Sequence, residues 1–247
     1  MPGLGDCCPS ELPPIVTDEY TAKGNYETLH GLKTYITGAS SSTRGLVFVY
    51  DVFGFAPQTL QGADRLADSL GAVVLMPDIL RGEYAQEAWF TSDDMADQRT
   101  AFMTMAAPPK HTGTLVDVAR EAAEKYPAVK GWGALGLCWG GKVVALASDH
   151  GPFCVSGQAH PGAPTKDDAE KMTIPHICLA APSDNKDGGI DGYGEAFGQE
   201  GSVSHVETYE KMHHGWMGAR ADLQNEDNAK EFERGYAQVA AFFAKHF

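Results

Sequence analysis

The sequence contains no long apolar run and no excess of basic residues. No stretch approaches the roughly 20 consecutive apolar residues that a membrane-spanning helix needs. Its 19 lysines and arginines are outnumbered by 33 aspartates and glutamates, which gives a formal net charge of −14. Such a chain repels the phosphates of nucleic acids and of anionic membranes, so we expect neither as a partner.

The cysteines are few and follow no disulfide or metal-binding pattern. Residues 1–6 lack the basic region and the apolar run of a secretory signal. An odd number of cysteines without framework spacing is typical of reduced thiols, so we expect a cytoplasmic protein. The adjacent Cys7 and Cys8 are interpreted as ordinary thiols on an N-terminal arm, residues 1–25. The alternative, a metal or redox pair, has no CxxC motif or nearby histidine to support it. The five cysteines are Cys7, Cys8, Cys138, Cys154 and Cys178.

The pattern that is present predicts one α/β domain over residues 1–247. A chain of this length with 43% hydrophobic residues can fill one large core. Strands alternating with helices, without a repeat or a linker, favour a mostly parallel sheet with helices on both faces. Residues 82–111 show no clear periodicity and are expected to lie irregularly over the site. The expected strands are 26–29, 32–37, 46–50, 72–76, 132–137, 153–158, 176–181 and 203–209, and the expected helices are 57–70, 115–126, 142–148 and 225–246.

The strongest chemical signal is a glycine-flanked cysteine between a predicted strand and a predicted helix. Residues 136–141 read Gly-Leu-Cys-Trp-Gly-Gly, which has the G-x-C-x-G form of a nucleophile elbow. Glycines flank the nucleophile because side chains there would collide with the neighbouring strand and helix. The turn would push the Cys138 thiol out at the C-terminal edge of the sheet, and the Trp139 N–H at the helix start would stabilise an oxyanion.

Two later strand ends offer an acid and a base in the order that this elbow requires. Asp184 follows the strand 176–181, and His214 follows the strand 203–209. The imidazole would shuttle the proton, and the carboxylate would orient it. His213 is the alternative base, and Asp187 and Asp191 are alternative acids. Two adjacent histidines could also bind a metal weakly, but no third ligand at metal-like spacing accompanies them, so we expect no metal site.

From residue 26 to the C-terminus, the sequence resembles the dienelactone hydrolase (carboxymethylenebutenolidase) family of the α/β-hydrolase superfamily. The resemblance rests on the cysteine elbow, Asp184, the pair His214-Gly215, and two segments that follow strands. These segments are Tyr-Asp-Val-Phe-Gly at 50–54 and Pro-Asp-Ile-Leu-Arg-Gly at 77–82. A Cys-Cys-Pro arm at 7–9 is similar to the fungal branch of the family.

The resemblance implies roles for four further residues. The family has a glutamate where this chain has Asp51, and that carboxylate helps to activate the thiol. Because Asp51 is one methylene shorter, its contact with Cys138 is expected to be longer or water-mediated. Val52 is implied as the second oxyanion donor beside Trp139. Arg81 and Arg220 are implied to grip a substrate carboxylate, although the spacing of Arg220 from the histidine departs from the family pattern.

These residues predict hydrolysis of an activated ester or lactone through a thioester on Cys138. The resemblance implies a small, dienelactone-like substrate that is anionic if the arginines bind it, and neither a metal nor an organic cofactor is expected. The alternatives are a thioesterase or lactonase of secondary metabolism, a ligand-binding module on a hydrolase scaffold, or a redox-sensing thiol protein. A monomer and a homodimer are both compatible with the sequence.

Overall fold

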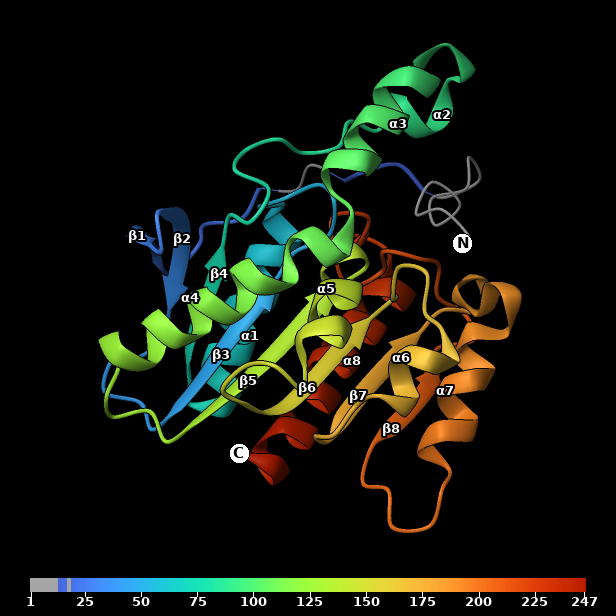
Figure 1. The fold of residues 1–247 in the computed structure, drawn as a ribbon. Coiled ribbons are helices and arrows are strands. Elements are labelled where there is room, and N and C mark those ends of the chain that lie inside the picture. Colours follow the sequence, from blue (N-terminus) through green and yellow to red (C-terminus); the bar gives the residue numbers. More distant parts are fainter. Residues whose placement is uncertain (1–12, 17–18) are drawn as a thin grey trace.

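The computed structural model describes residues 13–16 and 19–247, and its centre is a single eight-stranded sheet (Figure 1). The strand order is β1-β2-β4-β3-β5-β6-β7-β8. β1 and β2 form an antiparallel hairpin, and β2 also pairs antiparallel with β4. From β4 to β8, each pair of neighbouring strands is parallel. Cys7 and Cys8 lie outside the described residues. The strands are β1 Asn25–Leu29, β2 Leu32–Thr37, β3 Arg44–Val49, β4 Val73–Pro77, β5 Gly131–Leu137, β6 Phe153–Ala159, β7 His176–Ala180 and β8 His205–Thr208.

Helices cover both faces of the sheet, as the alternating pattern predicted. In Figure 1, α4 and α5 lie across one face, and α1 and α8 lie together on the other. Local sequence sets the ends of α1: Pro57 occupies its first turn, and Gly71 ends it in the left-handed region at φ 57°. The helices are α1 Pro57–Leu70, α2 Ala88–Thr91, α3 Ala96–Met105, α4 Thr112–Lys125, α5 Trp139–Ala147, α6 Lys166–Glu170, α7 Gly189–Phe197 and α8 Glu226–His246.

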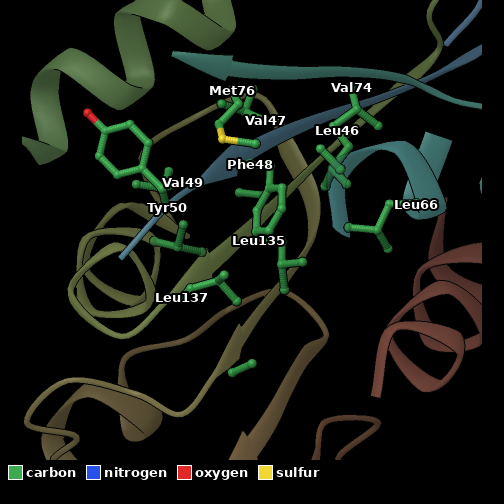
Figure 2. Close-up of a cluster of buried hydrophobic side chains, with 14 of the residues drawn as sticks. Leu46, Val47, Phe48, Val49, Tyr50, Leu66, Val74, Met76, Leu135 and Leu137 are labelled. Carbon is green, nitrogen blue, oxygen red and sulfur yellow. The ribbon is translucent and has the colours of Figure 1, made fainter. Parts of the chain in front are cut away.

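The central strands carry apolar side chains on both faces, as expected for a covered parallel sheet. Every residue of β4 is buried, and so are residues 45–49 of β3. Figure 2 shows Leu46 and Phe48 of β3 among side chains from the neighbouring strands, including Met76 of β4 and Leu135 of β5. This packing fixes the positions of the strand ends, from which the candidate catalytic residues extend.

The prediction of an irregular 82–111 segment was wrong in part. This segment contains the helices α2 and α3, which project beyond the end of the sheet at which α5 begins (Figure 1). Periodicity did not reveal α3 because Phe102 is its one buried side chain, so it has no apolar stripe. α7 was also missed, because three glycines in nine residues weaken the helical signal. In the described ranges, no helix is long and apolar enough to cross a membrane.

Candidate active site

Cys138 occupies a strained turn between β5 and α5, as the elbow motif predicted. Its backbone lies at φ 49° and ψ −114°, a conformation that non-glycine residues rarely adopt. A Cβ on Gly136 would lie 2.1 Å from the Gly140 carbonyl oxygen, and one on Gly140 would lie 2.4 Å from the Tyr50 carbonyl oxygen. The two glycines are therefore required by close packing of the elbow on itself and on the end of β3.

The backbone after β6 holds the elbow from the other side. The Cys138 N–H donates to the Ala159 carbonyl at 3.0 Å, and the Gly162 N–H donates to the Cys138 carbonyl at 2.9 Å. Both backbone polar groups of Cys138 are thus held by hydrogen bonds. Rigid support of this kind holds a reactive thiol in one orientation.

The Cys138 thiol, the His214 imidazole and the Asp184 carboxylate form a continuous chain of contacts. His214 Nε2 lies 3.1 Å from Cys138 Sγ, and His214 Nδ1 lies 2.6 Å from Asp184 Oδ1. The other carboxylate oxygen, Oδ2, accepts the Ala181 N–H at 2.7 Å. All three side chains are buried. Gly215 follows the histidine at φ 93°, and this left-handed turn directs the His214 ring toward the thiol.

The alternative bases and acids lie in other surroundings. His213 is half-buried, and its Nδ1 lies 2.9 Å from the His214 carbonyl oxygen. Asp187 and Asp191 are exposed, and Asp191 accepts a hydrogen bond from the Asn185 amide at 3.0 Å. Geometry therefore favours His214 and Asp184 over these alternatives.

Asp51 is buried at the end of β3, and backbone amides bind both of its carboxylate oxygens. Oδ1 accepts the Phe53 N–H at 2.9 Å, and Oδ2 accepts the Ala219 N–H at 2.9 Å. Burial raises the pKa of Asp51 above its ordinary value, although these two amides act in the opposite direction. Asp51 therefore joins the turn after β3 to the loop after His214.

Trp139 and Val52 lie where the elbow packs against the turn after β3. Trp139 is the first residue of α5, so its N–H is at the positive end of that helix. Its indole Nε1–H donates to the Ala106 carbonyl at 2.5 Å, and its ring stacks on Tyr50 with centroids 6.3 Å apart. Val52 is buried, and its carbonyl accepts the Ala85 N–H at 2.9 Å.

The two predicted substrate arginines occupy different places. Arg81 is exposed, and its guanidinium donates to the Gly31 carbonyl at 3.4 Å in the β1–β2 turn. Three strand spacings of about 4.8 Å separate β2 from β5, so this contact lies roughly 14 Å to the side of the elbow. Arg220 is 3% exposed and pairs with Glu87 at 3.1 Å. The structure thus places Arg220 beside Phe53 in the turn that bears Asp51, and it places the Arg81 guanidinium against the β1–β2 turn.

His160, at the end of β6, is a buried neighbour of His214 that the sequence did not reveal. Its ring centroid lies 5.2 Å from that of His214, edge to face. Within the described part of the chain, neither of its ring nitrogens has a hydrogen-bond partner. Burial lowers the pKa of His160 well below its ordinary value, so the ring is neutral. Its place at a strand end, on the same sheet edge as Cys138, was the available signal.

An open, largely apolar cleft of about 500 Å³ adjoins the turn after β3. None of the described residues that line it carries a charged side chain. Within residues 13–16 and 19–247, no group of three or more His, Cys, Asp or Glu side chains is placed to hold a metal ion. The lining residues are Ile15, Val16, Phe53, Phe55, Ala56, Pro57, Gly82, Tyr84, Ala85 and Gln86.

Known proteins with similar sequences include fungal and animal examples. An uncharacterized AIM2 family protein of Schizosaccharomyces pombe is 33% identical over 97% of this chain and 98% of its own length. A carboxymethylenebutenolidase homolog of Xenopus tropicalis is 30% identical over 55% of this chain and 53% of its own length. The first of these agrees with the predicted fungal branch.

Solved structures show the same fold at low sequence identity. A putative dienelactone hydrolase from Klebsiella pneumoniae superposes with a TM-score of 0.68 at 18% identity, covering 92% of this chain and 99% of that one. A dienelactone hydrolase-like promiscuous phosphotriesterase from metagenomic libraries gives a TM-score of 0.65, also at 18% identity, covering 92% and 98%. These likenesses confirm the predicted α/β-hydrolase fold.

The family model described as "Dienelactone hydrolase family" matches residues 32–247. This match covers the whole sheet from β2 onward, the cysteine elbow and both partner loops. The chain therefore belongs to the dienelactone hydrolase family.

Proposed function

We propose that this protein hydrolyses activated esters or lactones through a covalent thioester on Cys138. The observation that carries the proposal is the buried chain Cys138–His214–Asp184, with contacts of 3.1 Å and 2.6 Å. Membership of a hydrolase family supports the reaction class. The residue roles and the substrate are our assignment.

Acylation begins when His214 Nε2 takes the proton of Cys138 and the sulfur attacks the substrate carbonyl carbon. The carbonyl oxygen becomes an oxyanion, which accepts hydrogen bonds from the Trp139 and Val52 amides. The bond to the leaving oxygen then breaks, and His214 returns its proton to that oxygen. In a lactone the leaving group stays attached to the acyl chain.

Deacylation uses the same groups in reverse order. His214 removes a proton from water, and the resulting hydroxide attacks the thioester carbonyl. Collapse of the second tetrahedral intermediate releases the carboxylic acid, and the proton held by His214 returns to the sulfur. Asp184 holds His214 in the tautomer with a hydrogen on Nδ1 and stabilises the imidazolium that forms in both halves.

A cysteine nucleophile favours substrates with good leaving groups. A thiolate is itself a good leaving group, so an intermediate with a poorly activated alkoxide would expel sulfur and return to substrate. An enol lactone releases a stabilised enolate, which makes a dienelactone-like compound the preferred candidate. A thioester, or a lactone with an activated leaving oxygen, from secondary metabolism meets the same requirement and is the second candidate.

Asp51 is proposed as a positioning residue. Through the Ala219 amide it fixes the loop that follows His214, and its buried carboxylate lies in the same turn as the Val52 oxyanion donor. We also propose a cytoplasmic location, which rests on the scattered cysteines of the sequence.

Steady-state hydrolysis of a dienelactone and of p-nitrophenyl acetate tests the proposal. We expect turnover of both by the wild type and none by Cys138→Ala, with a pre-steady-state burst where deacylation limits the rate. Ligand-induced thermal stabilisation without release of product would instead favour a binding module. Rapid peroxide oxidation of Cys138 with no ester turnover would favour a redox sensor.

A further inference from the structure

Residues 85–106, which we call the bridging segment, contain α2 and α3 and are bonded at both ends to residues beside the nucleophile (Figure 1). At the first residue, the Ala85 N–H donates to the Val52 carbonyl at 2.9 Å. At the last residue, the Ala106 carbonyl accepts the Trp139 indole N–H at 2.5 Å. Val52 and Trp139 are the two residues whose amides bind the oxyanion in the proposed mechanism. The bridging segment therefore connects the two proposed donors.

Side chains from outside α3 bind the carbonyls at its C-terminal end. The last carbonyls of a helix have no partner within the helix. Here the Ala106 carbonyl binds Trp139, and the Met105 carbonyl accepts a hydrogen bond from His111 Nε2 at 3.0 Å. Phe102 is the one buried side chain of α3, so burial of an apolar stripe contributes little to holding this helix. These two hydrogen bonds therefore hold the end of α3 against the elbow.

The Trp139 ring is fixed by contacts on several sides. It is buried, it stacks on the Tyr50 ring, and it meets the His111 ring edge to face with centroids 5.3 Å apart. Its backbone directly follows Cys138 and begins α5. A rotation that displaced the Trp139 amide would also disturb these ring contacts and the bond to Ala106. The side chain thus resists movement of the donor amide to which it is attached.

The other donor is held by the opposite end of the bridging segment. Besides the bond from Ala85 to the Val52 carbonyl, the Phe90 ring of α2 lies 6.2 Å from the Phe53 ring, edge to face. Phe53 directly follows Val52 in the turn after β3. Both donors are therefore fixed from the same segment, and stabilisation of an oxyanion depends on donors that are in place before charge develops.

We propose that the bridging segment holds the two oxyanion donors in register, and that the Trp139 side chain is the positioning residue that joins this segment to the elbow. This inference rests on the proposed hydrolase function. It assigns the indole N–H a role in transition-state stabilisation that is separate from activation of the thiol.

The test compares Trp139→Phe with Trp132→Phe. Trp132 is also buried and lies in β5, the strand that leads to Cys138, but within the described residues its indole N–H has no hydrogen-bond partner. Both variants lose the same atoms, and Trp139→Phe alone loses a hydrogen bond. We expect kcat/KM for p-nitrophenyl acetate to fall about 10- to 100-fold in Trp139→Phe, because a small displacement of a donor weakens its bond to the oxyanion. In Trp132→Phe it should stay within about 3-fold of wild type, because no bond to the site is lost.

Alkylation of Cys138 by iodoacetamide is the second readout. This displacement at a saturated carbon needs the thiolate but forms no oxyanion, so its rate should stay within about 3-fold of wild type in both variants. Should Trp139→Phe fail to fold, benzothienylalanine at position 139 keeps the bicyclic ring and replaces only the N–H with sulfur, and the same two rates are measured.

Three results would count against this account. Equal kcat/KM in the Trp139 and Trp132 variants would overturn the role of the indole N–H. Parallel losses of ester hydrolysis and of alkylation in the Trp139 variant would overturn its assignment to the oxyanion, because the thiol itself would then be affected. Absence of ester turnover by the wild type would instead contradict the proposed function, and the inference with it.

Discussion

Replacing Asp184 with asparagine should reverse the tautomer of His214, the base in the proposed mechanism. Asp184 Oδ2 accepts the Ala181 N–H at 2.7 Å, and Oδ1 faces His214 Nδ1 at 2.6 Å. An asparagine would keep its oxygen toward the Ala181 N–H, so its NH2 group would face His214. His214 Nδ1 would then have to accept, and the ring proton would move to Nε2, which faces Cys138 Sγ.

The expected loss follows from this wrong tautomer. A base whose Nε2 already carries a proton cannot accept the thiol proton, and comparable substitutions in triads cost about 10³- to 10⁴-fold, or roughly 4 to 5.5 kcal/mol of barrier. The fold should change little, since the oxygen and the NH2 group of the introduced asparagine each keep a hydrogen-bond partner. Loss of a charge-assisted bond costs about 1 to 2 kcal/mol, which lowers Tm by roughly 2 to 8 °C in a domain of this size.

The assay combines kcat/KM for p-nitrophenyl hexanoate with the rate of Cys138 alkylation by iodoacetamide. Both should fall together in Asp184→Asn, because both require the proton to leave the thiol. Asp187→Asn is the control, since Asp187 is exposed and its φ of 57° suits asparagine. Retention of more than a tenth of wild-type activity in Asp184→Asn, or an equal loss in Asp187→Asn, would refute the assignment of the acid.

Two further predictions concern the surroundings of the site and the core. Gly218→Ala would place a Cβ 2.4 Å from Asp51 Oδ2, so the bond from the Ala219 amide should be lost. We expect a lower kcat/KM and a loss of about 1.5 to 3 kcal/mol in chemical unfolding, whereas Gly194→Ala, where the Cβ has open space, should be neutral or stabilising. An undiminished kcat/KM in Gly218→Ala would remove the case for Asp51 as a positioning residue. Burial lowers the pKa of His176 to about 3 in the folded protein, whereas the pKa in the unfolded chain is about 6.5. Below pH 6.5 the unfolded chain therefore binds a proton that the native chain does not. The free energy of unfolding then falls by about 1.4 kcal/mol for each pH unit of acidification. Between pH 6.5 and pH 5 the wild type should therefore lose about 2 kcal/mol more than His176→Gln, and parallel pH dependences of the two proteins would contradict this.

The sequence was sufficient to predict the strands that lead to Cys138 and Asp184 and that support them. Apolar runs marked β3, β5 and β7 because these strands are buried on both faces, and strand ends of a parallel sheet meet at one edge. The glycines around Cys138 and after His214 could be interpreted from the sequence because a side chain at these positions would clash with the neighbouring backbone or strain the turn. That is why Cys138, Asp184 and His214 could be predicted to lie together before their distances were known.

Contacts between distant segments could not be read in this way. Arg220 was predicted to bind substrate, yet its surroundings depend on Glu87, 133 residues earlier, and on Pro13 at the other end of the chain. No periodicity or motif encodes these pairings, because they arise only when residues 13–16 and the segment before α2 pack against the loop that bears Arg220. His160 was missed for the same reason, because only its contact with the His214 ring makes it part of the site.

Mass spectrometry of the intact protein, after brief exposure to p-nitrophenyl acetate and to a dienelactone, tests the central claim most directly. The account predicts an acyl adduct that maps to Cys138 in the wild type, no adduct at this position in Cys138→Ala, and no turnover by that variant. Cys138→Ser shows whether an oxygen nucleophile can replace sulfur in the same elbow. No adduct and no turnover with either compound, or an adduct and turnover that persist in Cys138→Ala, would contradict the account.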